Sequence, residues 1–183
     1  VVKEDITLEE VRDVCKKAYI DDYIMSLPNQ YDTLIGEGGV NLLDSAFVKD
    51  VCKICKEKDV LVIFDEVQCG LGRTGHLFGF QEFCVEADIV TLAKGLGGGL
   101  PIGAILCNEK LADTFAPGDH GSTFGGNPVV CAGAMAVIDQ ICNDNLLSSV
   151  QAKGKLIRET LLKADLPLVK NIRGLGLMIG IEV

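Results

Sequence analysis

The stretch Leu61–Lys94, LVIFDEVQCGLGRTGHLFGFQEFCVEADIVTLAK, decides the predicted fold of the chain. Two short apolar runs, at 60–64 and 89–93, frame this stretch, and each is followed by a charged residue, Asp65 or Lys94. Short apolar runs bounded by polar or glycine-rich segments predict buried strands of a parallel sheet. Since ligands of open α/β sheets lie outside the carboxyl ends of the strands, we expect the acid and the lysine to face one crevice.

Helices are predicted on both sides of this stretch. Asp44 is a candidate N-cap for a helix to about Lys58, and Thr7 with Glu10 forms a capping box for a helix to about Lys17. Further along the chain we expect one strand, two helices and a last strand, at 103–107, 128–142, 146–163 and 173–183. Together these elements indicate an α/β fold, a mostly parallel sheet with flanking helices, preceded by a short helical segment.

The composition is that of a soluble α/β protein rather than a disordered one. The 183 residues are 48% hydrophobic and include 21 glycines. There are 17 Lys and Arg against 26 Asp and Glu, a net charge of −9, which argues against a nucleic-acid-binding surface. No apolar run approaches the roughly 20 residues of a membrane span, and no secretory leader is recognisable, so we expect neither.

Eight cysteines raise the question of a metal site or disulfides. Cys52 and Cys55 form a CxxC pair, but there is no second pair, and neither His76 nor His120 has the spacing of a further ligand. The pair shares helical spacing with four apolar residues, Phe47, Val48, Val51 and Ile54. We therefore predict that the pair packs in the core and that the thiols are free, as in a cytoplasmic protein.

An acid and a lysine at neighbouring strand ends suit one kind of cofactor chemistry. Pyridoxal 5′-phosphate needs a lysine amine for a Schiff base and an acid that keeps its ring nitrogen protonated. Three ordered segments resemble the class-III aminotransferases: FDEVQCGLGRTG at 64–75, DIVTLAKGLGGGLPIGAILC at 88–107 and HGSTFGGNP at 120–128. The resemblance runs from about Gly36 to Val183 and is greatest to members that act on acetylornithine.

The resemblance implies part of the large domain of a fold-type-I pyridoxal-phosphate transferase. It implies that Lys94 forms the Schiff base and moves the proton at the substrate Cα. Asp65 would pair with the pyridine nitrogen, and Gln68 would donate to the phenolic oxygen of the cofactor. Ser122 and Thr123 would contact the cofactor phosphate, the threonine that of the neighbouring subunit, so a homodimer is implied.

The substrates are also implied by the resemblance. Glu37, within the GEGG segment at 36–39, matches an acid that lies near the substrate in ornithine-type members of the family. The implied reaction is a ping-pong transamination in which acetylornithine gives its amino group and 2-oxoglutarate receives it. Members that act on ornithine, succinylornithine or 4-aminobutyrate are alternatives.

Structural roles remain open for the same residues. At the end of a buried strand, Lys94 is expected to favour its neutral, nucleophilic form, or else to extend to solvent. Asp65 could cap its strand end, and the hydroxyls at 122–123 could make ordinary turn bonds. Glu66 is predicted to be structural, and Arg173 to fix a turn.

The first 42 residues resemble a different family, the helical subdomain of ATP-binding-cassette ATPases, and we predict a join within Gly36–Leu42. The run LVIFDE at 61–66 also matches the Walker B form. However, no G-x-x-x-x-G-K-[ST] sequence occurs in the chain, so we reject nucleotide hydrolysis. The predicted domains are therefore a helical segment at 1–40, a partial large domain at 41–170 and the start of a small domain at 171–183.

Several parts that the family uses lie outside this sequence. They are an upstream phosphate loop, an aromatic residue that stacks on the cofactor, and the arginines that bind substrate carboxylates. Because an incomplete constellation loses most of its rate, we expect little or no turnover from this chain. A non-catalytic fragment is the remaining alternative.

Overall fold

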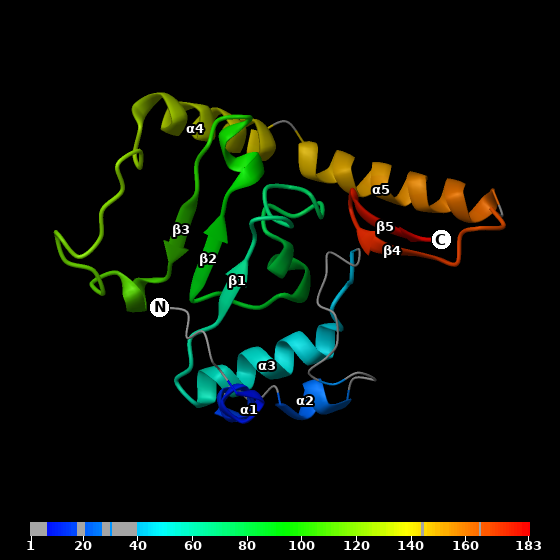
Figure 1. Cartoon of the computed structure of the whole chain (residues 1–183). Coiled ribbons are helices and arrows are strands. Elements are labelled where there is room, and N and C mark those ends of the chain that lie inside the picture. The colour runs from blue at the N-terminus through cyan, green and yellow to red at the C-terminus, as the bar shows by residue number, and fades with distance from the viewer. Residues whose placement is uncertain (1–6, 18–20, 27–29, 31–39, 144, 165) are drawn as a thin grey trace. The chain divides into compact units, whose positions relative to one another are not determined.

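The computed structural model describes residues 7–17, 21–26, 30, 40–143, 145–164 and 166–183 (Figure 1). The chain divides into two compact units, 1–38 and 39–183. Glu37 and most of the segment predicted to contain the join lie outside the described residues. The domain boundaries expected at residues 40 and 170 stay predictions.

The first unit contains two short helices, α1 (Leu8–Lys17) and α2 (Asp21–Ser26). The helix predicted to end at about Lys17 is thereby confirmed. The Arg12 guanidinium donates to both carboxylate oxygens of Asp21, at 3.0 and 3.1 Å. This bidentate ion pair links the two helices.

The second unit is built on a three-stranded sheet in the order β1 (Ile63–Asp65), β2 (Ile89–Leu92) and β3 (Ala104–Cys107) (Figure 1). β1 runs parallel to β2, whereas β3 runs antiparallel to β2. The prediction of a mostly parallel sheet is therefore corrected to a mixed sheet. The reason lies in the connection 93–103, which holds a single helical turn, whereas parallel strands need a crossover of a dozen or more residues.

Burial is concentrated on the central strand. Val90 and Leu92 of β2 are buried and form the core with Leu96 and Ala134. β1 is half-buried or exposed along its length, and on β3 Ile105 is 73% exposed. The prediction of buried strands thus holds for β2 and is wrong for β1, because in the described part of the chain β1 has a neighbouring strand on one edge.

The helix α3 (Ser45–Glu57) begins where the sequence predicted, because the Asp44 side chain accepts a hydrogen bond from the Phe47 N–H at 3.0 Å. Its predicted apolar face is covered only in part. Val48 is buried, whereas the remaining three apolar positions are exposed: Phe47, Val51 and Ile54. Cys52 and Cys55 are half-buried, so the predicted core packing of this pair is only partial.

The cysteines are free thiols. All eight lie without a disulfide, in half-buried or exposed positions. Among the described residues, there is also no group of three His, Cys, Asp or Glu side chains that could hold a metal ion. No described helix is long and apolar enough to cross a membrane.

Two long helices follow the sheet, α4 (Pro128–Asn143) and α5 (Leu146–Lys163), and both were predicted. The Asn127 side chain caps α4 by accepting from the Val129 N–H at 3.0 Å. α4 lies across the end of the sheet where β1 and β2 finish, and it packs on the 3₁₀ turn η3 (Lys94–Gly97) (Figure 1). The remaining short turns are η2 (Gly79–Phe83) and η4 (Glu109–Leu111).

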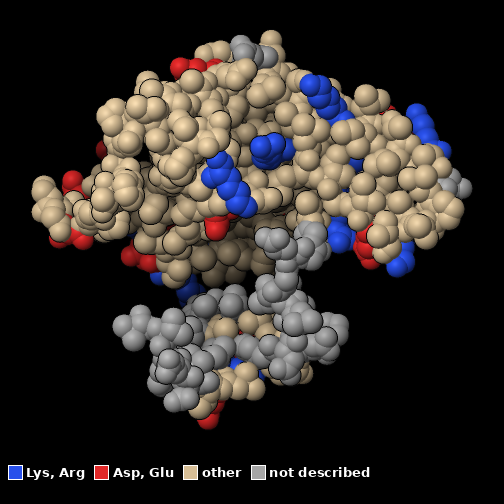
Figure 2. Space-filling view, turned by 45° about the horizontal axis from the view of Figure 1, so that its top comes forward, with Lys and Arg blue, Asp and Glu red and all other residues tan. Residues whose placement is uncertain are grey.

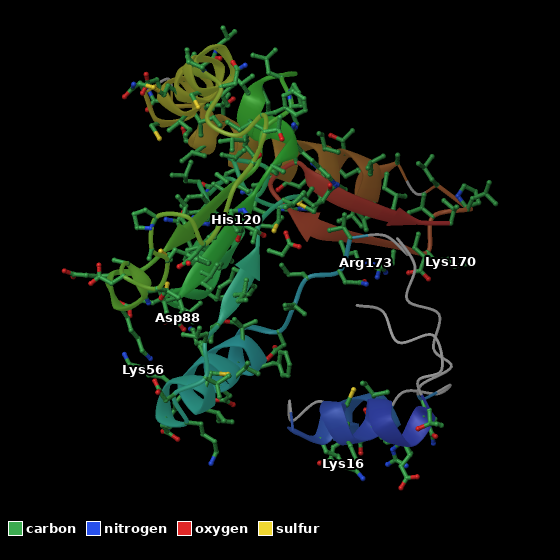
Figure 3. The ribbon with its side chains drawn as sticks, turned by 60° about the vertical axis from the view of Figure 1, so that its left-hand side comes forward. Lys16, Lys56, Asp88, His120, Lys170 and Arg173 are labelled. Carbon is green, nitrogen blue, oxygen red and sulfur yellow. The ribbon has the colours of Figure 1, made fainter. Side chains whose placement is uncertain are left out.

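The last residues form a hairpin of β4 (Asn171–Leu175) and β5 (Met178–Glu182), where the sequence predicted one strand. Arg173 lies on β4 rather than fixing a turn as predicted (Figure 3). Its Nε donates to the Val40 carbonyl at 2.8 Å, and its Nη1 pairs with Glu182 at 2.7 Å. These bonds tie the hairpin to the beginning of the second unit.

Candidate functional site

The candidate site lies at the carboxyl ends of β1 and β2. Because the two strands are parallel, with Asp65 opposite Thr91, both finish at the same edge of the sheet. Asp65 is the last residue of β1, and Lys94 follows β2 after a single intervening residue. The acid and the lysine thus lie at one edge of the sheet, but they do not face one crevice as expected, because Lys94 and Asp65 line different cavities.

Lys94 and Gln68 are in direct contact. The Lys94 Nζ donates a hydrogen bond to the Gln68 Oε1. Both residues line a cavity of about 730 Å³, called here the Lys94 cavity. Its walls also include the loop 70–73, side chains of α4 and α5, and the hairpin residues 177–179. A cavity of this volume can accommodate a small organic ligand.

The backbone at Lys94 is held in an unusual conformation. Its φ is 47°, in the left-handed region, and Leu71 in the facing loop has φ 55°. This conformation costs an L-residue about 1–2 kcal/mol, and residues held in it cluster at functional sites. It persists here because Leu96, two residues further on, is anchored in the core. Sequence reasoning missed this feature.

Lys94 is exposed, so the expectation that this lysine is buried at the end of its strand is wrong. The strand β2 ends at Leu92, and the chain turns into η3 before the lysine side chain begins. The side chain therefore leaves the core and extends to Gln68, as in the alternative in which the lysine reaches solvent.

Asp65 lies at the same edge but lines a different cavity. Its Oδ1 accepts hydrogen bonds from the Val67 N–H at 3.1 Å and the Thr91 hydroxyl at 3.0 Å. This is the strand-end cap that was its alternative role. The carboxylate lines a second, mostly apolar cavity of about 420 Å³. Pairing with a pyridine nitrogen stays a prediction.

Glu66 has the structural role that the sequence predicted. It is 2% exposed, and its carboxylate accepts from the Gly79 and Phe80 N–H groups, each at 2.9 Å. The Cys69 thiol donates to the same carboxylate at 3.2 Å. Burial, followed by the bond to Glu66, raises the pKa of the Cys69 thiol to about 12. Glu66 thus fixes the loop that follows β1.

The structure does not bring Ser122 and Thr123 to the Lys94 cavity. Both are exposed, and neither lines that cavity. The Ser122 Oγ accepts from the Gly125 N–H at 3.0 Å, which is the turn bond proposed as the structural alternative. The role of the two hydroxyls toward a phosphate stays a prediction.

Two polar residues of the Lys94 cavity were missed by sequence reasoning. Arg73 enters it from the glycine-rich loop, and Gln140 from α4. The signal for Arg73 was present, since it is a cation inside a glycine-rich loop directly after a strand end. Nothing local distinguishes Gln140 from a solvated helix residue.

Comparison with known proteins identifies the class to which this fold and site belong. The chain belongs to the class-III aminotransferase family, which matches residues 30–183. It is 51% identical over 166 residues to the acetylornithine aminotransferase of Caldanaerobacter subterraneus subsp. tengcongensis, an alignment covering 90% of this chain and 42% of that protein. The chain thus spans about two fifths of the length of this relative.

Solved structures agree with the sequence comparison. An ornithine aminotransferase from Toxoplasma gondii, with partial occupancy of pyridoxal phosphate at its active site, matches with a TM-score of 0.76 and 39% identity, over 81% of this chain and 36% of that one. Acetylornithine aminotransferase from Elizabethkingia anophelis matches with a TM-score of 0.75 and 41% identity, over 80% and 37%. The predicted fold class, part of the α/β fold of fold-type-I transferases, is confirmed.

Proposed function

We propose that this chain is part of a pyridoxal-phosphate-dependent aminotransferase that moves an amino group from acetylornithine to 2-oxoglutarate. The observation that carries the proposal is Lys94, held in a strained backbone at a strand end with its amine in a cavity beside Gln68. Because the chain spans about two fifths of its relatives, the activity is proposed for a longer protein.

The residues present fit the cofactor. The Lys94 amine opens into a cavity of about 730 Å³, and the Gln68 amide beside it can orient a ring substituent. Asp65 supplies a carboxylate at the same edge of the sheet. When bound, pyridoxal phosphate supplies an electron sink for the substrate Cα.

Each residue has a proposed part in the chemistry. Lys94 would hold the cofactor and afterwards carry the proton at the substrate Cα, since its side chain is exposed and ends in a primary amine. Gln68 orients that amine by accepting its hydrogen bond. Asp65 would have to turn from its cap bonds toward the ring nitrogen in order to stabilise positive charge there.

The choice of substrate depends on sequence likeness. The relative that is 51% identical is an acetylornithine aminotransferase, whereas solved ornithine aminotransferases match the fold equally well. Acetylornithine is therefore favoured over ornithine, succinylornithine and 4-aminobutyrate. A homodimer, with Ser122 and Thr123 facing the partner's cofactor, and a cytoplasmic location belong to the same proposal.

The likeness of residues 1–42 to cassette ATPases remains a separate hypothesis. The aminotransferase family match begins at residue 30, ahead of the predicted join at Gly36–Leu42. The alignment with the Caldanaerobacter enzyme covers 90% of the chain, so it also reaches upstream of Gly36. These observations favour aminotransferase sequence over the predicted join.

Borohydride reduction tests the proposed cofactor. The purified chain is mixed with pyridoxal phosphate, reduced, digested and mapped by mass spectrometry. We expect the label on the peptide that contains Lys94, its loss in Lys94→Arg, and weaker labelling in Asp65→Ala. Lys110→Arg, an exposed lysine paired with Asp59, serves as the matched control and should label like the native chain. Labels scattered over surface lysines would reject the proposal.

Turnover is a separate measurement. We expect little or no glutamate from this chain in a coupled assay with acetylornithine and 2-oxoglutarate, because catalysis requires a complete and oriented set of groups. Robust glutamate formation would show that the chain holds the whole catalytic constellation.

A further inference from the structure

A second large cavity lies at the end of the sheet opposite to Lys94, where β1 and β2 begin and β3 finishes. It has a volume of about 890 Å³ and is called here the far-edge cavity. Val62, Asp88 and Asn108 line it and mark this end, since they stand directly before β1, directly before β2 and directly after β3. Neither Lys94 nor Gln68 lines it, so a ligand in this cavity lies outside the candidate site.

The floor of the far-edge cavity is apolar. Val90 of β2 and Leu106 of β3 are opposite each other in the sheet, and Phe80 of η2 packs against the same core. Val90 is buried, whereas Leu106 is 44% exposed, so apolar surface is left uncovered at this point. Covering that surface with the apolar side chain of a ligand is favourable.

The rim of the far-edge cavity carries both signs of charge in equal number. Three lysines and three acids line it, so their formal charges cancel: Lys53, Lys56 and Lys110 against Asp59, Glu86 and Asp88. Figure 2 shows Lys and Arg side chains scattered singly among mostly uncharged residues on the face seen there, so six charged side chains around one cavity are a local concentration. A wall of this kind favours neither an anion nor a cation, and it suits a molecule that carries one charge of each sign.

Three of these charges already have partners within the wall. Lys110 forms an ion pair with Asp59. The Asp88 carboxylate accepts hydrogen bonds from the Val62 N–H at 2.8 Å and from the Asn108 Nδ2 at 2.7 Å. These contacts join the beginnings of β1 and β2 to the end of β3, so their role is to hold the wall of the cavity together.

The other three charges are free to bind a ligand. Lys53 and Lys56 stand three positions apart on α3 and therefore on one side of that helix, and both are exposed. Figure 3 shows Lys56 and Asp88 close together at this end of the sheet. Glu86, on the segment that leads into β2, is exposed as well. Within the described residues, none of the side chains of Lys53, Lys56 and Glu86 forms an ion pair or a hydrogen bond.

One acceptor in the wall also lacks a donor. The Asn108 Oδ1 is buried and accepts no hydrogen bond from the part of the chain that the structure describes. A buried acceptor without a donor is unfavourable, because it has lost its bonds to water. The far-edge cavity therefore offers two lysine ammonium groups that need an acceptor, and a carboxylate and an amide oxygen that need a donor.

From this arrangement we propose that the far-edge cavity binds a free α-amino acid with an apolar side chain. The carboxylate of the ligand accepts hydrogen bonds from Lys53 and Lys56, and its ammonium group donates to Glu86 and to the Asn108 Oδ1. Its side chain covers Leu106 on the apolar floor. Binding changes no covalent bond and does not depend on the proposed function, since this cavity shares no lining residue with the cavity of the candidate site.

The test is equilibrium binding of L-leucine to the full chain by titration calorimetry. Two analogues each lack one of the charges of leucine: isocaproate has no ammonium group, and isoamylamine has no carboxylate. We expect each analogue to bind roughly tenfold more weakly than leucine or worse, because each leaves the free groups of one sign in the wall without a partner.

Variants of the rim test the same contacts from the side of the protein. The double variant Lys53→Gln and Lys56→Gln should weaken leucine binding by roughly tenfold or more, and Glu86→Gln by a smaller factor, because the Asn108 oxygen remains. Lys49→Gln is the matched control, since this exposed lysine lies one turn earlier on α3 and does not line the cavity. It should bind leucine like the native chain. All these positions are exposed, so the variants should keep the fold.

Three results would overturn the proposal. The first is absence of leucine binding by the native chain, or equal binding by the native chain and the double lysine variant. The second is equal binding of leucine and both analogues, since an apolar cavity alone explains that result. The third is loss of leucine binding in Lys94→Arg, which places the amino acid in the candidate site; we expect this variant to bind leucine like the native chain.

Discussion

At the residue level, Glu66 fixes the loop that carries Gln68 and Arg73. We expect Glu66→Gln to lower the free energy of unfolding by about 2 kcal/mol or more, because an amide offers one oxygen where two backbone N–H groups need acceptors. Urea unfolding followed by circular dichroism measures this change. Glu86→Gln, at an exposed carboxylate, is the control and should stay within about 0.5 kcal/mol of the native chain. Equal stability of the two variants would contradict the structural role of Glu66.

Cys69 beside Glu66 should be chemically inert. Burial and the Glu66 carboxylate raise the pKa of its thiol to about 12. Since the thiolate is the nucleophile, we expect iodoacetamide at pH 8 to modify Cys69 on the order of 100-fold more slowly than the exposed Cys84. Peptide mass spectrometry over time gives both rates. In Glu66→Gln the Cys69 rate should rise, and comparable rates for the two cysteines in the native chain would refute the shift.

The raised pKa of the Cys69 thiol also makes the free energy of unfolding depend on pH. The folded pKa of the Cys69 thiol lies above that of an ordinary thiol, so the folded state binds the proton more tightly. The contribution of the Cys69 thiol to the free energy of unfolding is complete below the ordinary pKa of a thiol, and it is lost as the pH rises toward about 12. We expect Cys69→Ala to flatten the fall in stability over this alkaline range, which unfolding at a series of pH values measures. An unchanged slope would contradict the expectation.

At the element level, the contact between α5 and the hairpin depends on glycine. A methyl group on Gly154 would overlap the Gly176 carbonyl, and Gly176 itself has φ 55° with the backbone of Thr74 close by. Alanine normally stabilises a helix by about 1 kcal/mol relative to glycine. We nevertheless expect Gly154→Ala to destabilise the second unit, because two backbones meet at this point and neither can yield as a side chain can.

Gly133 provides the matched control for Gly154. It also lies inside a helix, but a methyl group there would meet the end of the flexible Leu100 side chain at 3.0 Å. We expect Gly133→Ala to be neutral or slightly stabilising in thermal unfolding, while Gly154→Ala lowers the midpoint. Equal behaviour of the two variants would mean that α5 does not need its close approach to the hairpin.

Elements with local signals were predicted from the sequence, and those that depend on distant partners were not. Asp44 and Asn127 set helix starts through bonds within a few residues, so their helices begin where expected or within a residue of it. The direction of β3 and the hairpin at 171–182 depend on the path of the chain, and the turn at Gly176 lacks an Asn-Gly or Asp-Gly signal. The apolar residues of β1 and β2 likewise predicted that both strands are buried. Burial also requires a partner that covers the strand, and apolarity alone does not supply one.

The candidate site also has features that could be predicted from the sequence and features that depend on the path of the chain. Asp65 and Lys94 could be placed at one edge of the sheet from the sequence, because the carboxyl ends of parallel strands meet there, whereas the hydrogen bond between Lys94 and Gln68 was not predicted. The cavity that Asp65 lines, and the entry of Arg73 and Gln140 into the Lys94 cavity, depend on side-chain direction and loop packing. No spacing rule in the sequence encodes these.

At the scale of the whole chain, the second unit exposes more large apolar side chains than a self-sufficient domain would. Several are more than 70% exposed: Ile105, Phe115, Phe124, Val129, Leu168 and Val183. Contiguous apolar patches of more than a few hundred Å² are rare on monomers and mark surfaces that contact other protein. Because the chain spans about two fifths of its relatives, this exposure fits surfaces that the rest of a longer protein or a second copy would cover.

We therefore expect the purified chain to bind the apolar dye ANS under native conditions and to associate as its concentration rises, because burying these side chains is favourable. Fluorescence and sedimentation velocity across a wide dilution series measure the two effects. The double variant Ile105→Thr and Phe124→Ser should weaken both, since it removes apolar surface at positions 73% and 87% exposed while threonine preserves the strand preference of β3. If the native chain stays monomeric and does not increase the fluorescence of ANS, its apolar side chains must cover one another in solution. That result would contradict the proposal that a longer protein is needed to cover them.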